Sequence, residues 1–290
     1  MTSANKICIG TANFAQKYGK IKNNKVSEKE IKKILNYCKK NNINDFDTAY
    51  TYKNEDIVGN LKPKNWTKLK ISSKLPIIPK NIKRIDLWMN KIIDNSLNKL
   101  KISKLNILYI HNLNSLLSKN GPEIYSQMVN LKKKGLINKV GISSYNPKDI
   151  LKIINQYKID VVQLPFNYLD QTLLENNTYK LFIKNKIEIY VRSIFLQGVL
   201  LTNNLNELQF NKLLMSKYQE VIKSISHSNL SKYEFALNFI IKNDIYKKIV
   251  FGIDSLDQLK KIQLFRKRND KINYYKLSTY NKKIIYPHYW

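Results

Sequence analysis

The sequence predicts a single α/β domain folded as a closed (β/α)8 TIM barrel with eight parallel strands. Short runs rich in β-branched residues alternate with longer, helix-periodic segments along the whole chain. The length of 290 residues suits one such barrel. An open, doubly wound sheet is the competing arrangement, but its first strand would normally lead into a GxGxxG turn, and the first strand here leads into IGTANFAQKYG.

Eight strands are expected from the apolar runs. They cover residues 6–11, 44–48, 70–74, 105–111, 140–144, 161–166, 188–193 and 249–253. All of these runs except that at 44–48 are followed by a segment with helical character, and repeated strand-then-helix units imply a parallel sheet.

Helices are expected in the intervals, and several of their starts have a physical reason. They cover residues 27–41, 85–100, 122–134, 147–156, 171–184, 206–243 and 255–264. Ser27 precedes Glu28 and Glu30, so a capping oxygen and first-turn acids meet the positive end of the helix dipole. Pro122 and Pro147 suit first-turn positions, where a missing N–H costs nothing. One apolar stripe is expected on the helix at 85–100, formed by Leu87, Ile92, Leu97 and Leu100.

The chain is strongly basic, with 51 Lys and Arg against 21 Asp and Glu and a formal net charge of +30. Such a charge suggests nucleic acid, an anionic membrane surface or an acidic substrate as a partner. The lysines are spread along the whole chain, however, and Lys, Asn, Ile and Tyr share A/T-rich codons. We therefore expect a solvated basic surface without a specific nucleic-acid site, whose field attracts phosphorylated ligands.

The remaining composition points to a cytoplasmic protein. Cys8 and Cys38 show no CxxC spacing, so neither a disulfide framework nor a zinc site is indicated. The N-terminal MTSANKICIG lacks the features of a signal peptide. No apolar run is long enough to predict a membrane span.

Polar residues recur where the predicted strands end, which is where barrel enzymes place their catalytic groups. Asp47 ends the second strand, Lys74 the third and His111 the fourth. Taken singly, a turn-forming Asp, a Lys reaching water and a structural His are the ordinary interpretations. Together they would converge on one mouth of the barrel, and because buried charges need partners, Asp47 and Lys74 are expected to pair.

Tyr52 adds a proton donor to this group. A phenol has a pKa of about 10, and we expect the nearby Lys74 ammonium to lower the pKa of Tyr52 toward neutrality. A neutral His111 imidazole could donate a hydrogen bond to a carbonyl oxygen. The set would protonate an oxygen as negative charge develops on it, which suits carbonyl reduction beside a hydride donor.

These motifs, in this order, resemble the aldo-keto reductase superfamily over nearly the whole chain. The strand-two signature is DTAYTY at 47–52, followed by Asn54, Glu55 and Gly59. Five further segments match later strands of the family: ISSKLP, LNILYIHN, GLINKVGISS, QLPFNYLD and FGIDSLDQLKK. RSIFLQGVLL resembles strand seven of a bacterial subgroup with an RSxFLQG motif.

The resemblance implies a (β/α)8 barrel with NADPH, or alternatively NADH, extended across its mouth. Tyr52 would be the general acid, Lys74 would tune it, Asp47 would pair with Lys74, and His111 would orient the substrate carbonyl.

The resemblance also implies a set of coenzyme contacts. Ser143, Ser144 and Gln163 would bind the nicotinamide carboxamide. Arg192 would stack on the nicotinamide face and Ser193 would contact the pyrophosphate. Thr11, Asp47, Gly252 and Gln258 complete the expected contacts. The residues that clasp the adenosine 2′-phosphate in many members fall at Gly252, Ile253 and Gln258, which leaves the preference for NADPH over NADH open.

The expected activity is reduction of a small-molecule aldehyde or ketone. The RSxFLQG subgroup implies a sugar-derived substrate, and the positive field of the chain is compatible with an anionic one. Two alternatives stay open: a catalytically silent coenzyme-binding barrel acting as redox sensor or scaffold, and nucleic-acid binding through the basic surface.

Residues 1–290 are expected to form one domain. The aromatic-rich tail at 265–290 is expected either to fold over the pocket or to pack on the barrel wall. The sequence predicts no oligomeric state.

Overall fold

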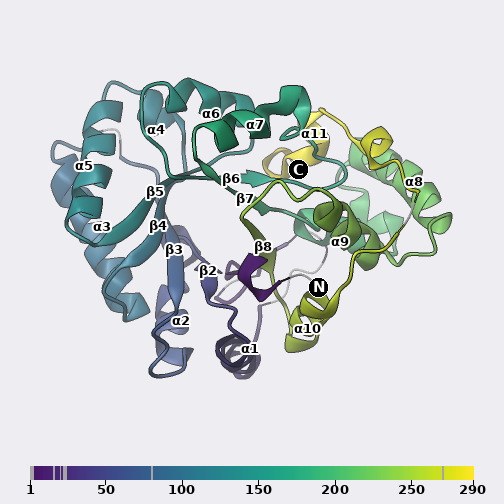
Figure 1. The fold of residues 1–290 in the computed structure, drawn as a ribbon, viewed down its shortest axis with the longest axis horizontal. Helices are drawn as coiled ribbons and strands as arrows, with labels where there is room; N and C mark the ends of the chain where they lie inside the picture. Colours follow the sequence, from purple (N-terminus) through teal and green to yellow (C-terminus); the bar gives the residue numbers. More distant parts are fainter. Residues whose placement is uncertain (1–2, 16, 20, 22–24, 80, 270) are drawn as a thin grey trace.

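The computed structural model describes residues 3–15, 17–19, 21, 25–79, 81–269 and 271–290. Within these residues, parallel strands pair in the order β1 to β8, and β8 closes onto β1 (Figure 1). The strands are β1 (Ile7–Gly10), β2 (Asp45–Asp47), β3 (Lys70–Leu75), β4 (Leu105–Ile110), β5 (Ile137–Ser143), β6 (Val161–Pro165), β7 (Glu188–Arg192) and β8 (Lys248–Gly252). The closed (β/α)8 barrel predicted from the sequence is confirmed.

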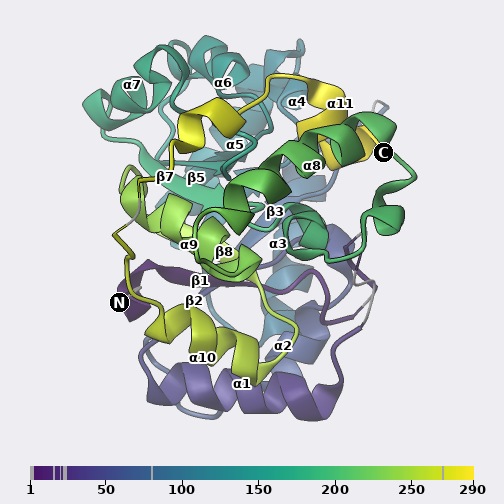
Figure 2. The same cartoon turned by 90° about the vertical axis from the view of Figure 1, so that its right-hand side faces the viewer.

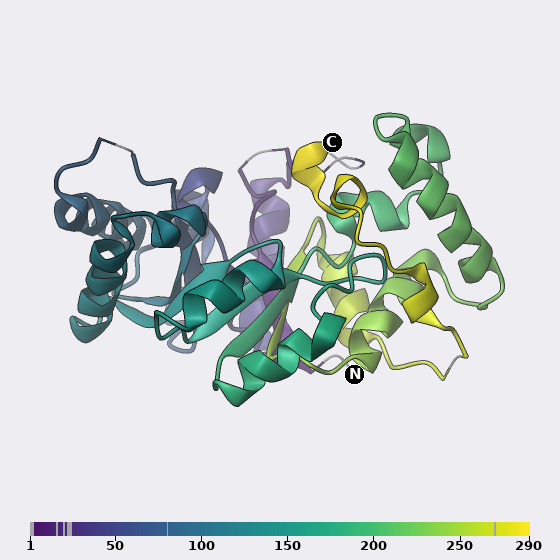
Figure 3. The same ribbon diagram turned by 90° about the horizontal axis from the view of Figure 1, so that it is seen from above.

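Helices surround the strands on the outside of the barrel (Figures 1 and 3). They are α1 (Glu28–Lys40), α2 (Glu55–Leu61), α3 (Ile85–Leu100), α4 (Asn114–Leu117), α5 (Gly121–Lys133), α6 (Pro147–Ile154), α7 (Thr178–Lys184), α8 (Lys212–Ser226), α9 (Lys232–Lys242), α10 (Leu256–Leu264) and α11 (Lys282–Ile285). Figure 2 shows α8 beside α11 and the C-terminus. In the described part of the chain, no helix combines the length and apolar character needed to cross a membrane.

The predicted helix starts are present. Ser27 Oγ accepts a hydrogen bond from the backbone N–H of Glu30 at 3.3 Å, which caps α1. Pro147 lies in the first turn of α6, after the cap Asn146. The apolar stripe predicted on α3 is wrong at one position, because Leu87 is 55% exposed. Its place in the core is taken by Met89 and Ile93.

Two predicted helices differ from the structure for local reasons. Of residues 171–184, only α7 is α-helical, because the Asp170 side chain accepts hydrogen bonds from the backbone N–H and hydroxyl of Thr172 and holds a turn. Asn176 and Asn177 then adopt positive φ angles of 51° and 55°. The region at 206–243 divides into α8 and α9, with a capping box at Ser231 starting the second helix.

The interior of the barrel carries two stacked ion pairs. Asp45 and Asp47 lie two residues apart on β2, so both side chains point to the same side of the strand. Asp45 accepts from Lys248 Nζ at 2.5 Å near the base of the barrel, and Asp47 pairs with Lys74 nearer the mouth. The interior is therefore partly polar, while the main hydrophobic core lies between the strands and the helices.

Candidate active site

One cavity of about 480 Å³ opens where the strands end, and it brings together nearly all residues predicted from the sequence. The predicted residues that line it are Thr11, Asp47, Tyr52, Lys74, His111, Ser143, Gln163, Arg192, Ser193, Gly252 and Gln258. Its volume lies within the range typical of ligand pockets. Ser144 is the predicted residue that does not line it.

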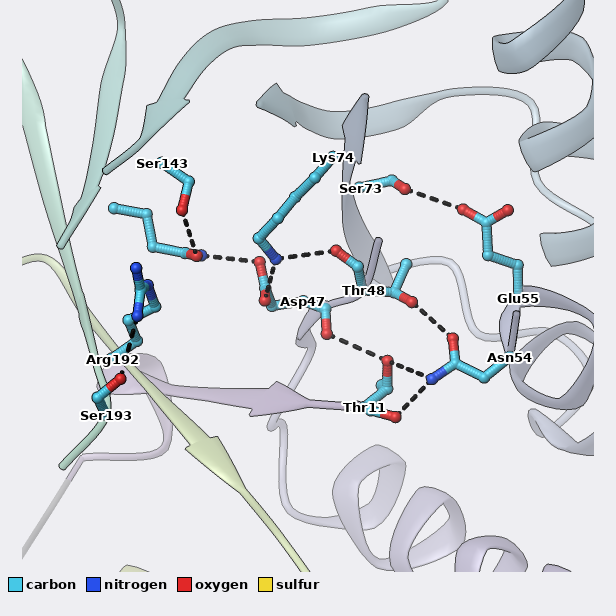
Figure 4. A network of polar contacts seen from close by, with 11 residues as sticks. Thr11, Asp47, Thr48, Asn54, Glu55, Ser73, Lys74, Ser143, Arg192 and Ser193 are labelled. Carbon is cyan, nitrogen blue, oxygen red and sulfur yellow. Dashed lines mark hydrogen bonds and ion pairs between the residues drawn. The ribbon is translucent and has the colours of Figure 1, made fainter. Parts of the chain in front are cut away.

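The centre of the site is the buried pair of Asp47 and Lys74 (Figure 4). Lys74 is 3% exposed and Asp47 is 5% exposed. Lys74 Nζ donates to Asp47 Oδ2 at 2.5 Å and to the carbonyl of Thr48 at 2.9 Å. The second carboxylate oxygen of Asp47 accepts from Gln163 Nε2 at 2.8 Å. Each buried charge thus has a partner of opposite sign or a hydrogen-bonding partner, as burial requires.

Tyr52 ends a single turn of 3-10 helix, Tyr50–Tyr52, which follows β2. The Lys74 ammonium lies 5.4 Å from the centre of the Tyr52 ring. Burial and the nearby Asp47 carboxylate raise the pKa of Tyr52 well above its ordinary value, and the positive charge of Arg192 opposes them.

The expectation that Lys74 lowers the Tyr52 pKa is therefore wrong. The Lys74 charge is matched by Asp47 at 2.5 Å, so the pair presents little net charge to the phenol. Tyr52 is a neutral phenol at physiological pH, which is the protonation state that a general acid needs before it reacts.

His111 follows β4 and its imidazole is exposed to the cavity. Desolvation by the surrounding walls lowers the pKa of His111 to about 4, with smaller effects of Lys74 and Arg192 in the same direction. Asp47 opposes this shift. At neutral pH the imidazole is uncharged and retains one N–H donor.

The ends of β5 and β6 place an amide and a hydroxyl beside Asp47. Gln163 is fully buried, and its Oε1 lies 3.4 Å from the Ser143 hydroxyl that donates to it. Ser144 turns away from the cavity: its hydroxyl donates to the carbonyl of Asn146 and accepts from the Asn146 backbone N–H. Ser144 therefore shapes the turn into α6, because both of its hydroxyl contacts lie there.

Arg192 ends β7 and carries a positive charge into the cavity. Its guanidinium carbon lies 4.4 Å from the centre of the Tyr145 ring. Its guanidinium donates hydrogen bonds to two neutral acceptors among the described residues, the Ser193 hydroxyl at 3.1 Å and the Ser144 carbonyl at 3.3 Å. A turn with positive φ angles follows at Ser193 and Gln197, so the backbone beside the cavity is held in an uncommon conformation.

The far wall of the cavity contains residues that the sequence analysis missed. Asp254 lines it just after β8, and Asp254 Oδ1 accepts from Asn13 Nδ2 at 2.7 Å. The Gln258 side chain accepts from the backbone N–H of Asp254 at 2.7 Å. Both Asn13 and Asp254 follow predicted strands by one to two residues, so a wider strand-end window would have found them.

The C-terminal tail packs beside the cavity. The Tyr286 hydroxyl donates to the Tyr145 carbonyl at 3.3 Å, and the rings of Tyr286 and His288 lie 5.1 Å and 4.9 Å from that of Tyr145. No described residue of the tail lines the cavity itself. The tail thus reaches the site through Tyr145, which lies between it and Arg192.

The arrangement suits proton transfer to an oxygen and binding of an organic coenzyme. Tyr52 and His111 offer uncharged donors, and Asp47 holds Lys74 in place. Among the residues within the described ranges, no group of His, Cys, Asp and Glu could hold a metal ion.

Comparisons with known proteins agree with the barrel fold and with the family resemblance of the sequence. The model of the aldo/keto reductase family matches residues 6–272. No curated protein sequence matches the chain. The fold is similar to aldo-keto reductase AKR11C1 from Bacillus halodurans in its holo form, with a TM-score of 0.73 and 17% identity over 91% of this chain and 88% of that one. It is also similar to the glycerol dehydrogenase AKR11B4 from Gluconobacter oxydans, with a TM-score of 0.67 and 19% identity over 91% and 87% of the two chains.

Proposed function

Because this chain belongs to the aldo/keto reductase family and is an NAD(P)H-dependent oxidoreductase, we propose that it reduces a small aldehyde or ketone with Tyr52 as the general acid. The observation that carries the proposal is the meeting of Tyr52, His111 and the Asp47–Lys74 pair in one cavity. A silent scaffold would not need a buried ion pair beside an uncharged phenol and imidazole, because burial of both charges is costly.

The side chains divide the work at the substrate oxygen. A bound reduced nicotinamide coenzyme would be the source of the hydride that the carbonyl carbon accepts. His111, uncharged at neutral pH, donates a hydrogen bond that orients the carbonyl. Tyr52 then gives its proton to the oxygen as negative charge develops there. Lys74, held by Asp47, neither gives nor accepts a proton in this step, and the pair fixes the polar floor beside Tyr52.

The proposed coenzyme contacts surround this centre. We assign the carboxamide contacts to Ser143 and Gln163 and the remaining path to Thr11, Ser193, Gly252 and Gln258. All six residues line the cavity, which supports this assignment. Ser144 is left out of the proposed contacts, because its hydroxyl faces Asn146, its backbone N–H donates to the Gln163 carbonyl at 3.0 Å and its carbonyl accepts from Arg192. Arg192 rests on Tyr145 on one side, and a planar guanidinium in this position suits stacking on a planar ring.

The sequence predicts NADPH as the coenzyme, with NADH as the alternative. One observation in the structure favours NADH over NADPH. A 2′-phosphate needs a cation, whereas the cavity wall after β8 presents the Asp254 carboxylate, and an acidic residue suits a free ribose 2′-hydroxyl. The ratio of kcat/KM for the two coenzymes decides between them. If Asp254 selects NADH, Asp254→Ser should raise the relative kcat/KM for NADPH.

The proposed substrate is a carbonyl compound with hydroxyl or anionic groups, such as a sugar derivative. Arg192 supports the anionic class, because its charge enters the cavity with hydrogen bonds only to neutral acceptors among those formed by described residues. One protein of similar fold is named a glycerol dehydrogenase, and this name supports a hydroxylated substrate.

A direct assay tests the proposal. Purified protein is mixed with NADPH or NADH and a panel of sugar-derived, anionic and simple carbonyl compounds, and coenzyme absorbance is followed. We expect oxidation of the coenzyme with at least one compound. Coenzyme binding without turnover of any compound would favour the silent barrel, and the absence of both binding and turnover would contradict the proposed function.

A further inference from the structure

A buried carboxylate lies directly behind the turn that carries Tyr52. Glu55 follows Tyr52 by three residues, begins α2 and is 2% exposed. Its Oε1 accepts from the Ser73 hydroxyl and its Oε2 from the Ser96 hydroxyl, both at 2.9 Å. Ser73 directly precedes Lys74 on β3 (Figure 4). Ser96 lies on α3.

Burial of the Glu55 carboxylate costs free energy, because the group loses its contact with water. Its hydrogen-bond donors are two neutral hydroxyls, and burial raises the pKa of Glu55 despite these bonds and the more distant charge of Lys99. An apolar side chain of similar volume would avoid that desolvation cost. The carboxylate offers instead two acceptor oxygens with fixed directions, which tie one backbone segment to two others.

The segment held by Glu55 has little regular structure of its own. Tyr52 ends a single 3-10 turn, and Lys53 follows with a positive φ of 53°. Asn54 ties the segment toward β1 and β2, accepting from the Thr48 hydroxyl at 2.7 Å and donating to the Thr11 carbonyl. The tie to β3, the strand that carries Lys74, comes from Glu55.

Helix α2 is itself docked closely against α3. A Cβ placed on Gly59 would meet the Lys99 carbonyl at 2.0 Å, so the glycine is needed for the two helices to approach. Glu55 therefore links the packed pair of helices α2 and α3 to Ser73, the residue of β3 that precedes Lys74.

We propose that Glu55 is a positioning residue that sets the Tyr52 hydroxyl relative to the Lys74 ammonium through its hydrogen bond to Ser73. The proposal rests on the proposed function, in which Tyr52 is the acid. Proton transfer is sensitive to such placement, because a shift of about 1 Å can reduce a rate by about a hundredfold.

Substitutions at Glu55 test this role. Glu55→Ala should lower kcat about 10- to 100-fold, while KM for the coenzyme stays within about twofold because the walls formed by β5 to β8 are untouched. Glu55→Gln keeps an acceptor for Ser73 and should recover most of kcat. Ser73→Ala, which leaves the bond from Ser96, should repeat the loss. The matched control is Asp56→Asn, which alters the exposed acid next to Glu55 in the same helix turn and should retain the wild-type kcat.

A double substitution separates positioning from general damage. In the Tyr52→Phe background, Glu55→Ala should reduce the residual rate by no more than about twofold, because the group that it positions is gone. An equal loss in both backgrounds would overturn the proposal. So would a Glu55→Ala protein that keeps the wild-type kcat.

Amide hydrogen exchange gives a readout that needs no turnover. Glu55→Ala and Ser73→Ala should speed exchange across residues 48–58 by at least about tenfold relative to Asp56→Asn. Exchange equal to that of the control would overturn the proposal. If the wild-type protein reduces no carbonyl, the proposed function fails on that result, and the exchange measurement still decides whether Glu55 holds the Tyr52 segment.

Discussion

His111 shows how the walls of the site set the charge of a single residue. Desolvation and the nearby cations lower its pKa to about 4, below the ordinary value of about 6.5. Between these two values the folded state therefore binds fewer protons than the unfolded state. The contribution of His111 to the free energy of unfolding is complete above about pH 6.5 and is lost as the pH falls toward about 4.

Titration of His111 by NMR should accordingly show a midpoint near 4 in the folded protein. The assignment comes from the signal that disappears in His111→Gln, and the same substitution should reduce the loss of stability on acidification. A midpoint near 6.5 would contradict the described environment of the imidazole.

Among single residues, we expect the largest loss of folding stability when one partner of the buried Asp47–Lys74 pair is removed. Lys74→Met leaves the Asp47 carboxylate buried with Gln163 but without a cation, and we expect a cost of about 3–5 kcal/mol in the free energy of unfolding. Lys148→Met is the control, because its pair with Glu175 is exposed and such pairs contribute about 1 kcal/mol or less. Urea denaturation measures both. Equal losses for the two substitutions would show that the buried pair contributes no more than a surface one.

At the scale of elements, the close packing of α2 on α3 predicts that a larger residue at Gly59 destabilises the protein. Gly59→Ala would force a methyl group against the Lys99 carbonyl, and overpacking of this kind costs about 1–3 kcal/mol. Gly252→Ala is the control for stability, since a Cβ there meets nothing within 4 Å. Thermal or urea unfolding compares the two. A Gly59→Ala protein as stable as the Gly252→Ala protein would contradict the close approach of these helices.

The elements were predictable where a local pattern decides the structure. Each strand follows from an apolar run bounded by polar residues, and the helix at 85–100 agrees with α3 at both ends. The helix predicted at 171–184 began too early because side-chain bonds of Asp170 compete with the helix, which periodicity does not register.

The candidate site was predictable to the same extent. The strand-end rule located Asp47, Lys74 and His111. It did not reveal that Ser144 turns toward Asn146 or that Asp47 cancels the effect of Lys74 on Tyr52. Those properties depend on side-chain contacts and on distances between strands, which a linear pattern does not contain.

For the whole molecule, the net charge of +30 contrasts with the balance inside the site. Lys74 is matched by Asp47, Tyr52 and His111 are uncharged at neutral pH, and Arg192 contributes a positive charge at the edge. The surface field can attract an anionic coenzyme from a distance. In the proposed reaction, the proton and the hydrogen bond to the substrate come from the uncharged donors within the cavity.

Transfer of deuterium from a reduced coenzyme labelled at C4 of its nicotinamide ring tests the central claim most directly. The wild-type protein should deliver the label to the former carbonyl carbon of the product. Tyr52→Phe should slow this transfer by about 10²- to 10⁴-fold while coenzyme binding stays within about twofold. Transfer at the wild-type rate by Tyr52→Phe, or a product that carries no label, would contradict carbonyl reduction with Tyr52 as the acid.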